Sequence, residues 1–308
     1  MKAIQLRDNP QTQELIEVDV PKPIPRDGEL LIKVCAAGVT PTELLWYPTL
    51  NTKDGQRRVH AIPCHEFSGV VAGLGAGVEY FTIGDEVYGM NDWFAQGAAA
   101  EYCITTPSSI ARKPVRISHA EAATVPIGAL TAWQGLFDRA KLQSGERVLV
   151  HGASGSVGVF VIQLAKLHGA YLIATASAQN RDFILSLGVD EAIDYNATAF
   201  ETVVGKVDVL FDGVGADTLS RSWNLLNPNG RAVTIAASSE GTNDERVKDA
   251  FFIVEPNRQQ LSDVSILIQN GSLSSFVGAE VPLKDASAAF AGTIPRSSGH
   301  GKLVLIPE

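Results

Sequence analysis

The segment 147–167 most constrains the fold, because it joins a short apolar run to a glycine turn and then to a longer apolar run. The first run predicts a buried strand and the second an apolar helix. The turn reads Ala153-x-Gly155-x-x-Gly158, so alanine stands where the common fingerprint has its first glycine. Small residues let the backbone approach a pyrophosphate, and the helix N-terminus offers it free N–H groups. The segment therefore predicts a dinucleotide-binding fold.

Size and charge limit the class of protein further. The 308 residues suggest two domains, and 45% hydrophobic residues are enough to form buried cores. A formal net charge of −9, without a basic stripe, argues against a nucleic-acid partner. Three scattered cysteines, Cys35, Cys64 and Cys103, fit a reducing compartment better than a disulfide framework. The N-terminus has no apolar signal core and no apolar run is long enough to span a bilayer, so we expect a cytoplasmic protein without a membrane segment.

The first third of the chain predicts strands and turns, and the part from residue 147 alternates strands with helices. An all-β region, expected as a small barrel, is predicted from six short runs: 1–7, 13–20, 29–38, 68–74, 86–89 and 98–105. The alternating part predicts a parallel, doubly wound sheet, with strands at 147–151, 171–175, 192–194, 207–211, 232–236 and 251–254. Ser118 and Glu121 predict a capping box, and Gly188 predicts a left-handed helix end. We expect a helix and a final strand within 279–308 to return to the first domain.

Several short motifs, in their order and spacing, resemble one family. They are Gly38-Val-Thr-Pro-Thr-Glu43, His65-Glu-Phe-Ser-Gly69, Gly84-Asp-Glu-Val-Tyr-Gly89, Ala99-Ala-Glu-Tyr102, Thr131-Ala-Trp133, residues 151–158, Asp212-Gly-Val-Gly215 and His300-Gly-Lys-Leu-Val304. The whole chain resembles the zinc-independent quinone oxidoreductase and oxoene (enone) reductase branch of the medium-chain dehydrogenase/reductases. The resemblance implies an α/β fold with a GroES-like β-barrel catalytic domain at 1–117 with 271–308. It also implies a Rossmann doubly wound parallel sheet at 118–270, which binds a nicotinamide cofactor.

The end of the second strand in the alternating part favours NADPH over NADH. NAD enzymes of this fold place a carboxylate about 20 residues past the glycine turn, on the ribose 2′-hydroxyl. Here Ser177 stands near that place, and Arg181 follows where its guanidinium can meet a 2′-phosphate. Relatives also use a tyrosine after the third strand, and Tyr195 has the matching position. The alternative for Arg181 is a solvated charge on a helix.

The resemblance assigns further residues to the cofactor and the substrate. Those expected at the cofactor are Thr131, Ala153, Gly155, Ser156, Val157, Gly158, Gly213, Val214, Phe252 and Lys302. Those expected in the substrate pocket are Trp46, Trp93 and Phe251. Two alternatives stay open: residues 251–253 are simply a buried strand, and Lys302 is a surface lysine at a strand start.

A catalytic zinc requires three protein ligands and an open position. His65-Glu66 resembles the histidine–glutamate pair of zinc alcohol dehydrogenases, but the first cysteine ligand becomes Thr40 and the third becomes Ile127. We therefore predict no metal and expect His65 to be a packed, hydrogen-bonded histidine. A stray metal site formed by His60, Cys64 and His65 stays open.

Without a metal, hydrogen-bond donors must polarise the substrate carbonyl. The resemblance suggests that hydride passes to the β-carbon of an enone, or to a quinone, and that a proton follows. Tyr47 is the predicted proton donor or substrate orienter, and Thr40 a predicted carbonyl donor where relatives carry asparagine. The alternative for Tyr47 is an aromatic residue that packs the loop. We find no nucleophile-elbow motif that would indicate a hydrolase.

The leading hypothesis is thus a metal-free, NADPH-dependent reductase of α,β-unsaturated carbonyls or quinones. Two alternatives remain: a zinc-type alcohol dehydrogenase, and a dinucleotide-binding structural or regulatory protein with little turnover. The family also suggests a homodimer that uses an edge strand near 231–254.

Overall fold

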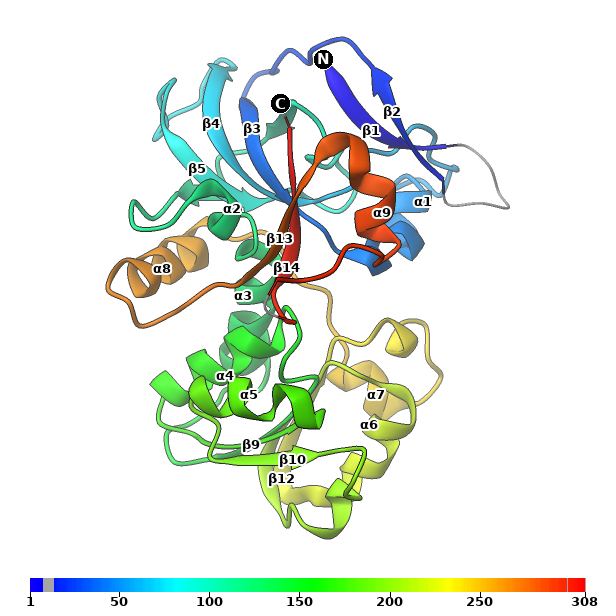
Figure 1. Ribbon diagram of the computed structural model, residues 1–308, viewed down its shortest axis with the longest axis vertical. Coiled ribbons are helices and arrows are strands. Elements are labelled where there is room, and N and C mark those ends of the chain that lie inside the picture. The colour runs from blue at the N-terminus through cyan, green and yellow to red at the C-terminus, as the bar shows by residue number, and fades with distance from the viewer. Residues whose placement is uncertain (8–13, 298, 308) are drawn as a thin grey trace. The chain divides into compact units, whose positions relative to one another are not determined.

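The chain folds into two compact units, drawn in Figure 1. The computed structural model describes residues 1–7, 14–297 and 299–307, so residue 13 of one expected strand and the last residue of the chain lie outside the described part. The first unit contains Met1–Ile127 and Pro256–Glu308, and the second contains Gly128–Glu255.

These boundaries differ from the expected 1–117 with 271–308 and 118–270, because two helices pack on the strands of the first unit. In α2 (His119–Ala122), the Nδ1 atom of His119 is hydrogen-bonded to the Ser68 hydroxyl at 2.8 Å. In α8 (Arg258–Gln269), the carbonyl of Leu261 accepts a hydrogen bond from the buried Tyr88 hydroxyl at 2.6 Å. Sequence periodicity shows that such helices are amphipathic, but it does not show which sheet they cover.

The first unit is built on β-sheets, as predicted. A small antiparallel sheet pairs β1 (Lys2–Leu6) with β2 (Leu15–Asp19). A seven-stranded sheet has the order β13-β14-β3-β4-β5-β7, with β6 also paired to β3. Its strands are β3 (Leu30–Gly38), β4 (Glu66–Leu74), β5 (Glu86–Met90), β6 (Tyr102–Thr105), β7 (Ile110–Arg112), β13 (Val277–Pro282) and β14 (Lys302–Ile306). The final strand therefore does return to the first unit, as expected.

Short helices complete the first unit. Two follow β3 directly: the 3₁₀ turn η1 (Pro41–Leu45) and α1 (Tyr47–Leu50). A further helix, α9 (Ala286–Phe290), precedes β14. The predicted capping box is confirmed, since the Ser118 hydroxyl accepts the Glu121 N–H while the Glu121 carboxylate accepts the Ser118 N–H.

The second unit is a parallel sheet of the order β10-β9-β8-β11-β12. Its strands are β8 (Arg147–His151), β9 (Tyr171–Ala176), β10 (Glu191–Asp194), β11 (Val207–Asp212) and β12 (Leu226–Thr234). Its helices are α4 (Gly158–Leu167), α5 (Arg181–Ser186), α6 (Ala216–Ser222) and α7 (Glu245–Ala250). Figure 1 draws α4 and α5 on one side of this sheet and α6 and α7 on the other, as a doubly wound fold requires. Gly188 has φ of 107°, which confirms the predicted left-handed helix end.

Two predicted strands of this unit are wrong in detail. The fifth strand covers 226–234 instead of 232–236, because Leu226 already pairs with Val207 and a bulge follows before the pairing resumes at Arg231. The segment 251–254 forms only a single bridge, from Phe251 to Thr234. Side chains take the place of a neighbouring strand here: Arg139 donates to the Phe251 carbonyl, and Gln134 exchanges two hydrogen bonds with the Glu255 backbone.

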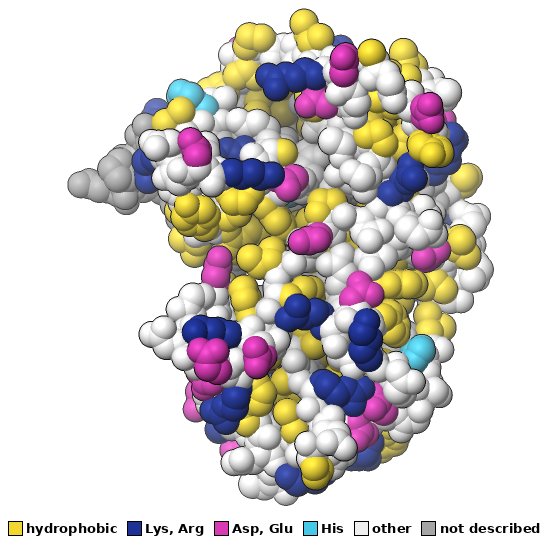
Figure 2. Space-filling view, turned by 180° about the vertical axis from the view of Figure 1, so that it is seen from behind, with side chains coloured by type: hydrophobic (Ala, Val, Ile, Leu, Met, Phe, Trp, Pro, Cys, Tyr) yellow, Lys and Arg dark blue, Asp and Glu magenta, His cyan; other side chains and the backbone are white. Residues whose placement is uncertain are grey.

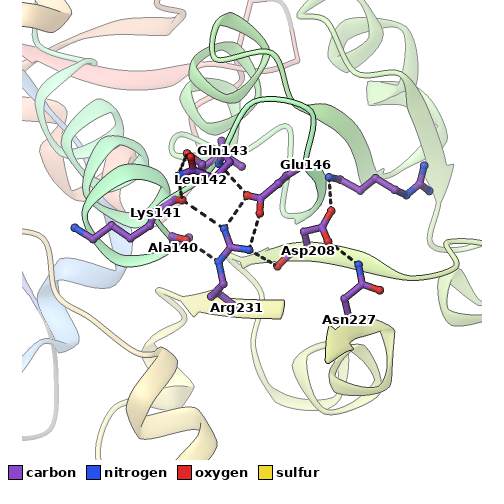
Figure 3. A network of polar contacts seen from close by, with 9 residues as sticks. Ala140, Lys141, Leu142, Gln143, Glu146, Asp208, Asn227 and Arg231 are labelled. Carbon is purple, nitrogen blue, oxygen red and sulfur yellow. Dashed lines mark hydrogen bonds and ion pairs between the residues drawn. The ribbon is translucent and has the colours of Figure 1, made fainter. Parts of the chain in front are cut away.

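A polar network holds the amino ends of the strands together (Figure 3). Arg231 of β12 binds Glu146 through two N–O contacts of 2.8 and 2.7 Å, and it also donates to the Ala140 carbonyl. Asp208 of β11 accepts from the Arg147 N–H and from the Asn227 side chain. The network lies at the edge of the sheet opposite the glycine turn, so we assign it to stability.

The surface gives no sign of a large single-sign field on the face drawn in Figure 2, where acidic and basic side chains are interspersed. Among the described residues, no helix combines the length and apolar character needed to cross a bilayer. The three cysteines are free thiols, and Cys64 and Cys103 are buried.

Candidate functional site

The glycine turn between β8 and α4 has the geometry of a phosphate-binding loop. The chain turns at Gly152, with φ of 77°, whereas Ala153 is buried and needs no positive φ. This explains why alanine is tolerated at the first fingerprint position. Gly155 and Ser156 are exposed at the tip of the turn, and α4 begins without a side-chain cap. Uncapped N–H groups at a helix N-terminus fit a phosphate ligand.

Close backbone packing fixes the rest of the turn. A Cβ atom on Gly158 would lie 2.3 Å from the Gly152 oxygen, so only glycine fits there. A Cβ atom on Gly128 would lie 2.4 Å from the Ser156 oxygen, so α3 (Pro126–Trp133) approaches the turn closely. Thr131, predicted at the cofactor, lies on this same helix and is buried.

A second glycine turn follows β11 and lies beside the first. The position of a Cβ on Gly152 is 3.6 Å from the Val214 side chain. The buried Asp212 carboxylate shapes this turn by accepting the N–H groups of Val214 and Gly215 at 3.0 Å. Val214 is about half exposed, and Gly213 is exposed too. The structure thus brings the predicted residues of both turns together.

The end of β9 also places its predicted residues near one another. Ser177 follows the strand directly, and its hydroxyl accepts from the Asn180 side chain, which leaves its own proton for a ligand. The Arg181 side chain is 57% exposed, and its ion partner Asp182 is more exposed still. Tyr195 is exposed, and its N–H donates to the Ala176 carbonyl beside Ser177. An exposed guanidinium whose ion partner is an exposed carboxylate is available to a phosphate.

The segment after α7 reaches the same edge of the sheet. Phe251 bridges to Thr234 at the end of β12, and the Phe252 ring lies 5.8 Å from the Arg139 guanidinium. Both phenylalanines are half-buried, whereas Ile253 is 50% exposed. The segment is therefore not a buried strand.

A buried polar row beneath these turns was missed by the sequence reasoning. Thr175, His151, Asp212 and Thr234 are register neighbours across β9, β8, β11 and β12. All four are at most 4% exposed. Thr175 contacts His151 at 2.8 Å, and Thr234 donates to Asp212 at 2.7 Å. The sequence shows a polar residue at or next to the end of each of these strands. It does not show that the four residues are neighbours, because strand register is a tertiary property.

In the first unit, the loop after β3 holds two buried polar groups that lack a partner. The Thr40 hydroxyl and the Glu43 Oε2 atom have no hydrogen bond among the described residues. Glu43 binds the Nδ1 atom of His65 with its other oxygen, and the Nε2 atom of His65 contacts the Ala95 carbonyl at 3.2 Å. His65 is thus packed and hydrogen-bonded, as predicted. Buried hydroxyls rarely lack a partner, so Thr40 is a donor that a substrate oxygen could use.

Aromatic side chains surround this loop. The Trp46 and Trp93 rings meet edge to face at 4.9 Å, and the His65 ring lies 5.2 Å from Trp93. Tyr47 is 49% exposed and lies 6.4 Å from Phe94. The two tryptophans predicted for the substrate pocket are therefore in contact. The position of Tyr47 fits both the proton donor and the loop-packing residue.

Arg58 ties the two loops that carry these aromatics. Its guanidinium donates to the Pro48 carbonyl in α1 and to the Ala95 carbonyl beside Trp93. It also donates to the Gln96 side chain, which in turn accepts the Ile62 N–H. No motif or periodicity in the sequence pointed to a role for Arg58.

Lys302 lies in a buried ion pair. Its ammonium binds the Glu66 carboxylate, and the same carboxylate accepts the Ile127 N–H at 3.0 Å. Burial raises the pKa of Glu66, while the Lys302 ammonium and the Ile127 N–H act in the opposite direction. The alternative that Lys302 is a surface lysine is wrong, since it is 6% exposed.

The donor set does not fit a catalytic zinc. Among the described residues, no three His, Cys, Asp or Glu side chains gather into a metal-binding group. His60 is exposed while Cys64 is buried, and burial raises the pKa of the Cys64 thiol far above its usual range. A thiol with a raised pKa is a poor ligand, because metals bind the thiolate.

Comparison with known proteins gives matches over most of the chain. Residues 26–115 match the model of the alcohol dehydrogenase GroES-like domain, and residues 187–305 match the model named zinc-binding dehydrogenase. A probable zinc-binding oxidoreductase, mitochondrial, of Arthroderma benhamiae is 33% identical, over 92% of this chain and 91% of that protein. A chloroplast envelope quinone oxidoreductase homolog of Arabidopsis thaliana is 29% identical, over 95% and 94%. Among solved structures, a quinone oxidoreductase from Coxiella burnetii has a TM-score of 0.87 and 29% identity over 99% of each chain.

Proposed function

Because the chain belongs to the quinone oxidoreductase branch of the medium-chain dehydrogenase/reductases, we propose that it is a metal-free reductase that uses NADPH. The observation that carries the proposal is the carboxyl end of β9. Residues 175–178 contain no carboxylate at the place where NAD enzymes of this fold bind the ribose 2′-hydroxyl, and Ser177 is followed there by the exposed Arg181. The exposed Tyr195 follows the neighbouring strand β10.

The residues of the second unit fit a dinucleotide. The uncapped N-terminus of α4 and the exposed turn at Gly155 and Ser156 would hold the pyrophosphate. Ser177 and Arg181 would bind the 2′-phosphate, and Tyr195 would border it. The turn at 213–215 and the segment at 251–252 would approach the nicotinamide half. The cofactor, once bound, supplies the hydride.

The first unit would bind the substrate oxygen. The Thr40 hydroxyl is buried and has no partner among the described residues, so it would donate to a carbonyl that gains negative charge as hydride is added. Tyr47 is half exposed and would supply or relay the proton. Trp46 and Trp93 would pack against a flat, conjugated substrate.

Lys302 was expected to reach the cofactor phosphates, and that role stays a prediction. Its ammonium is buried against Glu66 and is thereby held beside the first turn of α3.

Enones and quinones share the chemistry that this arrangement serves. Both are carbon–carbon double bonds conjugated to a carbonyl, so both accept hydride with charge developing on an oxygen. A zinc alcohol dehydrogenase would need the three-ligand set that Thr40 and Ile127 interrupt.

The test is NADPH oxidation by protein that has been dialysed against a chelator. The substrates are butenone, 2-hexenal, benzoquinone and the saturated aldehyde hexanal. We expect oxidation with the conjugated substrates and none above background with hexanal. Activity that requires added zinc would contradict the proposal. Tight NADPH binding without oxidation by any of the four would support the structural or regulatory alternative instead.

A matched pair of variants tests the donors. Tyr47→Phe should lower turnover more than the affinity for NADPH, while Phe94→Leu, which keeps the hydroxyl of Tyr47, should affect turnover less. An unchanged rate for Tyr47→Phe would assign Tyr47 to loop packing.

A cytoplasmic location and a homodimer remain predictions, and two of the relatives are named as mitochondrial or chloroplast proteins.

A further inference from the structure

The buried polar row at the carboxyl ends of β9, β8, β11 and β12 is not explained by cofactor contacts, since its side chains are enclosed in the protein. His151 is 1% exposed and Asp212 is fully buried. Burying a polar group costs free energy unless it has a hydrogen-bond partner, so apolar residues at these strand ends would avoid that desolvation cost. The hydrogen bonds of the row therefore indicate a structural role.

The hydrogen bonds assign the proton on His151. The Ser222 hydroxyl donates its single proton to the Thr218 carbonyl at 2.6 Å. Ser222 can then only accept from His151, at 2.9 Å, so the Nε2 atom of His151 carries hydrogen. Burial lowers the pKa of His151 to about 4, so the ring is neutral and its Nδ1 atom is an acceptor. That atom accepts a hydrogen bond from the Thr175 hydroxyl at 2.8 Å.

Each of these bonds ends on an element that borders the candidate cofactor site. His151 itself directly precedes the glycine turn at Gly152. Thr175 lies near the end of β9, shortly before Ser177 and Arg181. Ser222 lies in α6, the helix that follows the second glycine turn. The neutral imidazole of His151 thus links its own strand end by hydrogen bonds to the end of β9 and to α6, which come from distant parts of the sequence.

Asp212 completes the row on the other side. It accepts the N–H groups of Val214 and Gly215 and the hydroxyl of Thr234. The charged groups that act on His151 are Asp212, Glu201 and Arg221, and the ring of Phe200 packs edge-on against it at 4.6 Å. The row is therefore satisfied by protein groups and leaves the turns above it free for a ligand.

We propose that His151 is a positioning residue that sets the preference for NADPH over NADH, by fixing the end of β9 through Thr175. The proposal rests on the NADPH assignment made above. Ser177 and Arg181 can bind a 2′-phosphate only when the strand that carries them is held in place. NADH has no such phosphate and depends less on this end of the strand.

The test compares Thr175→Val, which removes the hydroxyl at nearly constant volume, with Thr175→Ser, which keeps it. We expect Thr175→Val to reduce the ratio of NADPH to NADH affinity by about tenfold, measured by calorimetric titration, and Thr175→Ser to retain it. His151→Phe, which lacks both ring nitrogens, should reduce the ratio at least as much. A folded Thr175→Val protein with an unchanged ratio would overturn the proposal.

A second readout needs no cofactor. In the protein labelled with ¹⁵N-histidine, His151 should give the nitrogen shifts of the Nε2–H tautomer throughout the neutral range. An Nδ1–H tautomer or an imidazolium at neutral pH would overturn the proposed network. Failure of the NADPH assignment is recognised separately, because the wild-type protein would then bind NADH as tightly as NADPH.

Discussion

The buried histidine of the polar row makes the stability of the second unit depend on pH, and the size of the effect follows from the structure. Burial lowers the pKa of His151 to about 4, whereas the unfolded chain has the ordinary value of about 6.5. Between these two values the unfolded state binds one proton more than the native state. Stability is thus complete above about pH 6.5 and is lost progressively as the pH falls towards 4.

The part of the unfolding free energy that is lost at low pH because of His151 can be measured by substituting this residue. Linkage of one proton between these pKa values gives about 2 kcal/mol of lost unfolding free energy between pH 7 and pH 5. His151→Gln keeps a donor and an acceptor but does not titrate, so its pH dependence should be shallower by this amount. Thr175→Ser keeps the imidazole and its partner, and should follow the wild type.

The assay can be confined to the unit that contains the histidine. Two of the four tryptophans, Trp133 and Trp223, lie in the second unit. In a background with Trp46→Phe and Trp93→Phe, fluorescence during urea unfolding therefore reports that unit. Equal pH dependence in wild type and His151→Gln would refute the assignment of a neutral, buried imidazole.

Three further predictions concern the same unit. Arg181→Ala should weaken NADPH binding about tenfold and NADH binding about twofold or less in calorimetric titrations, and equal losses would refute the 2′-phosphate assignment. In Gly155→Ala the new Cβ would lie 3.2 Å from the Gly152 oxygen, so this variant should fold normally but bind dinucleotide poorly. In Gly158→Ala the corresponding distance is 2.3 Å, so this variant should also have a lower thermal midpoint of unfolding. A Gly158→Ala protein as stable as the wild type would contradict this. Arg231→Ala should lower the unfolding free energy by about 2 kcal/mol without changing cofactor affinity. The loss is no larger because the Arg231 side chain is 32% exposed. Denaturant unfolding with the same fluorescence reporters measures the loss.

Local signals in the sequence were sufficient for much of the fold. The glycine turn at 152–158, the capping box at Ser118 and the left-handed end at Gly188 depend on nearby residues, and each was predicted correctly. The alternation of strands and helices likewise predicted the parallel sheet. The segment 251–254 was misread because an apolar run does not reveal that Arg139 binds the Phe251 carbonyl and that Gln134 binds the backbone of the adjacent Glu255.

The candidate site was less accessible to sequence reasoning. Ser177 and Arg181 were proposed from their distance past the glycine turn, and Tyr195 from the resemblance to the family. The buried row of Thr175 and His151 depends on strand register, and the burial of Lys302 depends on Glu66 from a distant strand. Pairings across such distances in the chain leave no periodic pattern in the sequence.

The central claim is reduction of a conjugated double bond by hydride from NADPH, without a metal. The most direct measurement uses NADPH carrying deuterium at the transferable position of the nicotinamide, with hexenal as substrate and the dialysed protein. We expect hexanal with deuterium on the β-carbon. Hexenol with deuterium on the carbinol carbon, formed only when zinc is present, would contradict it.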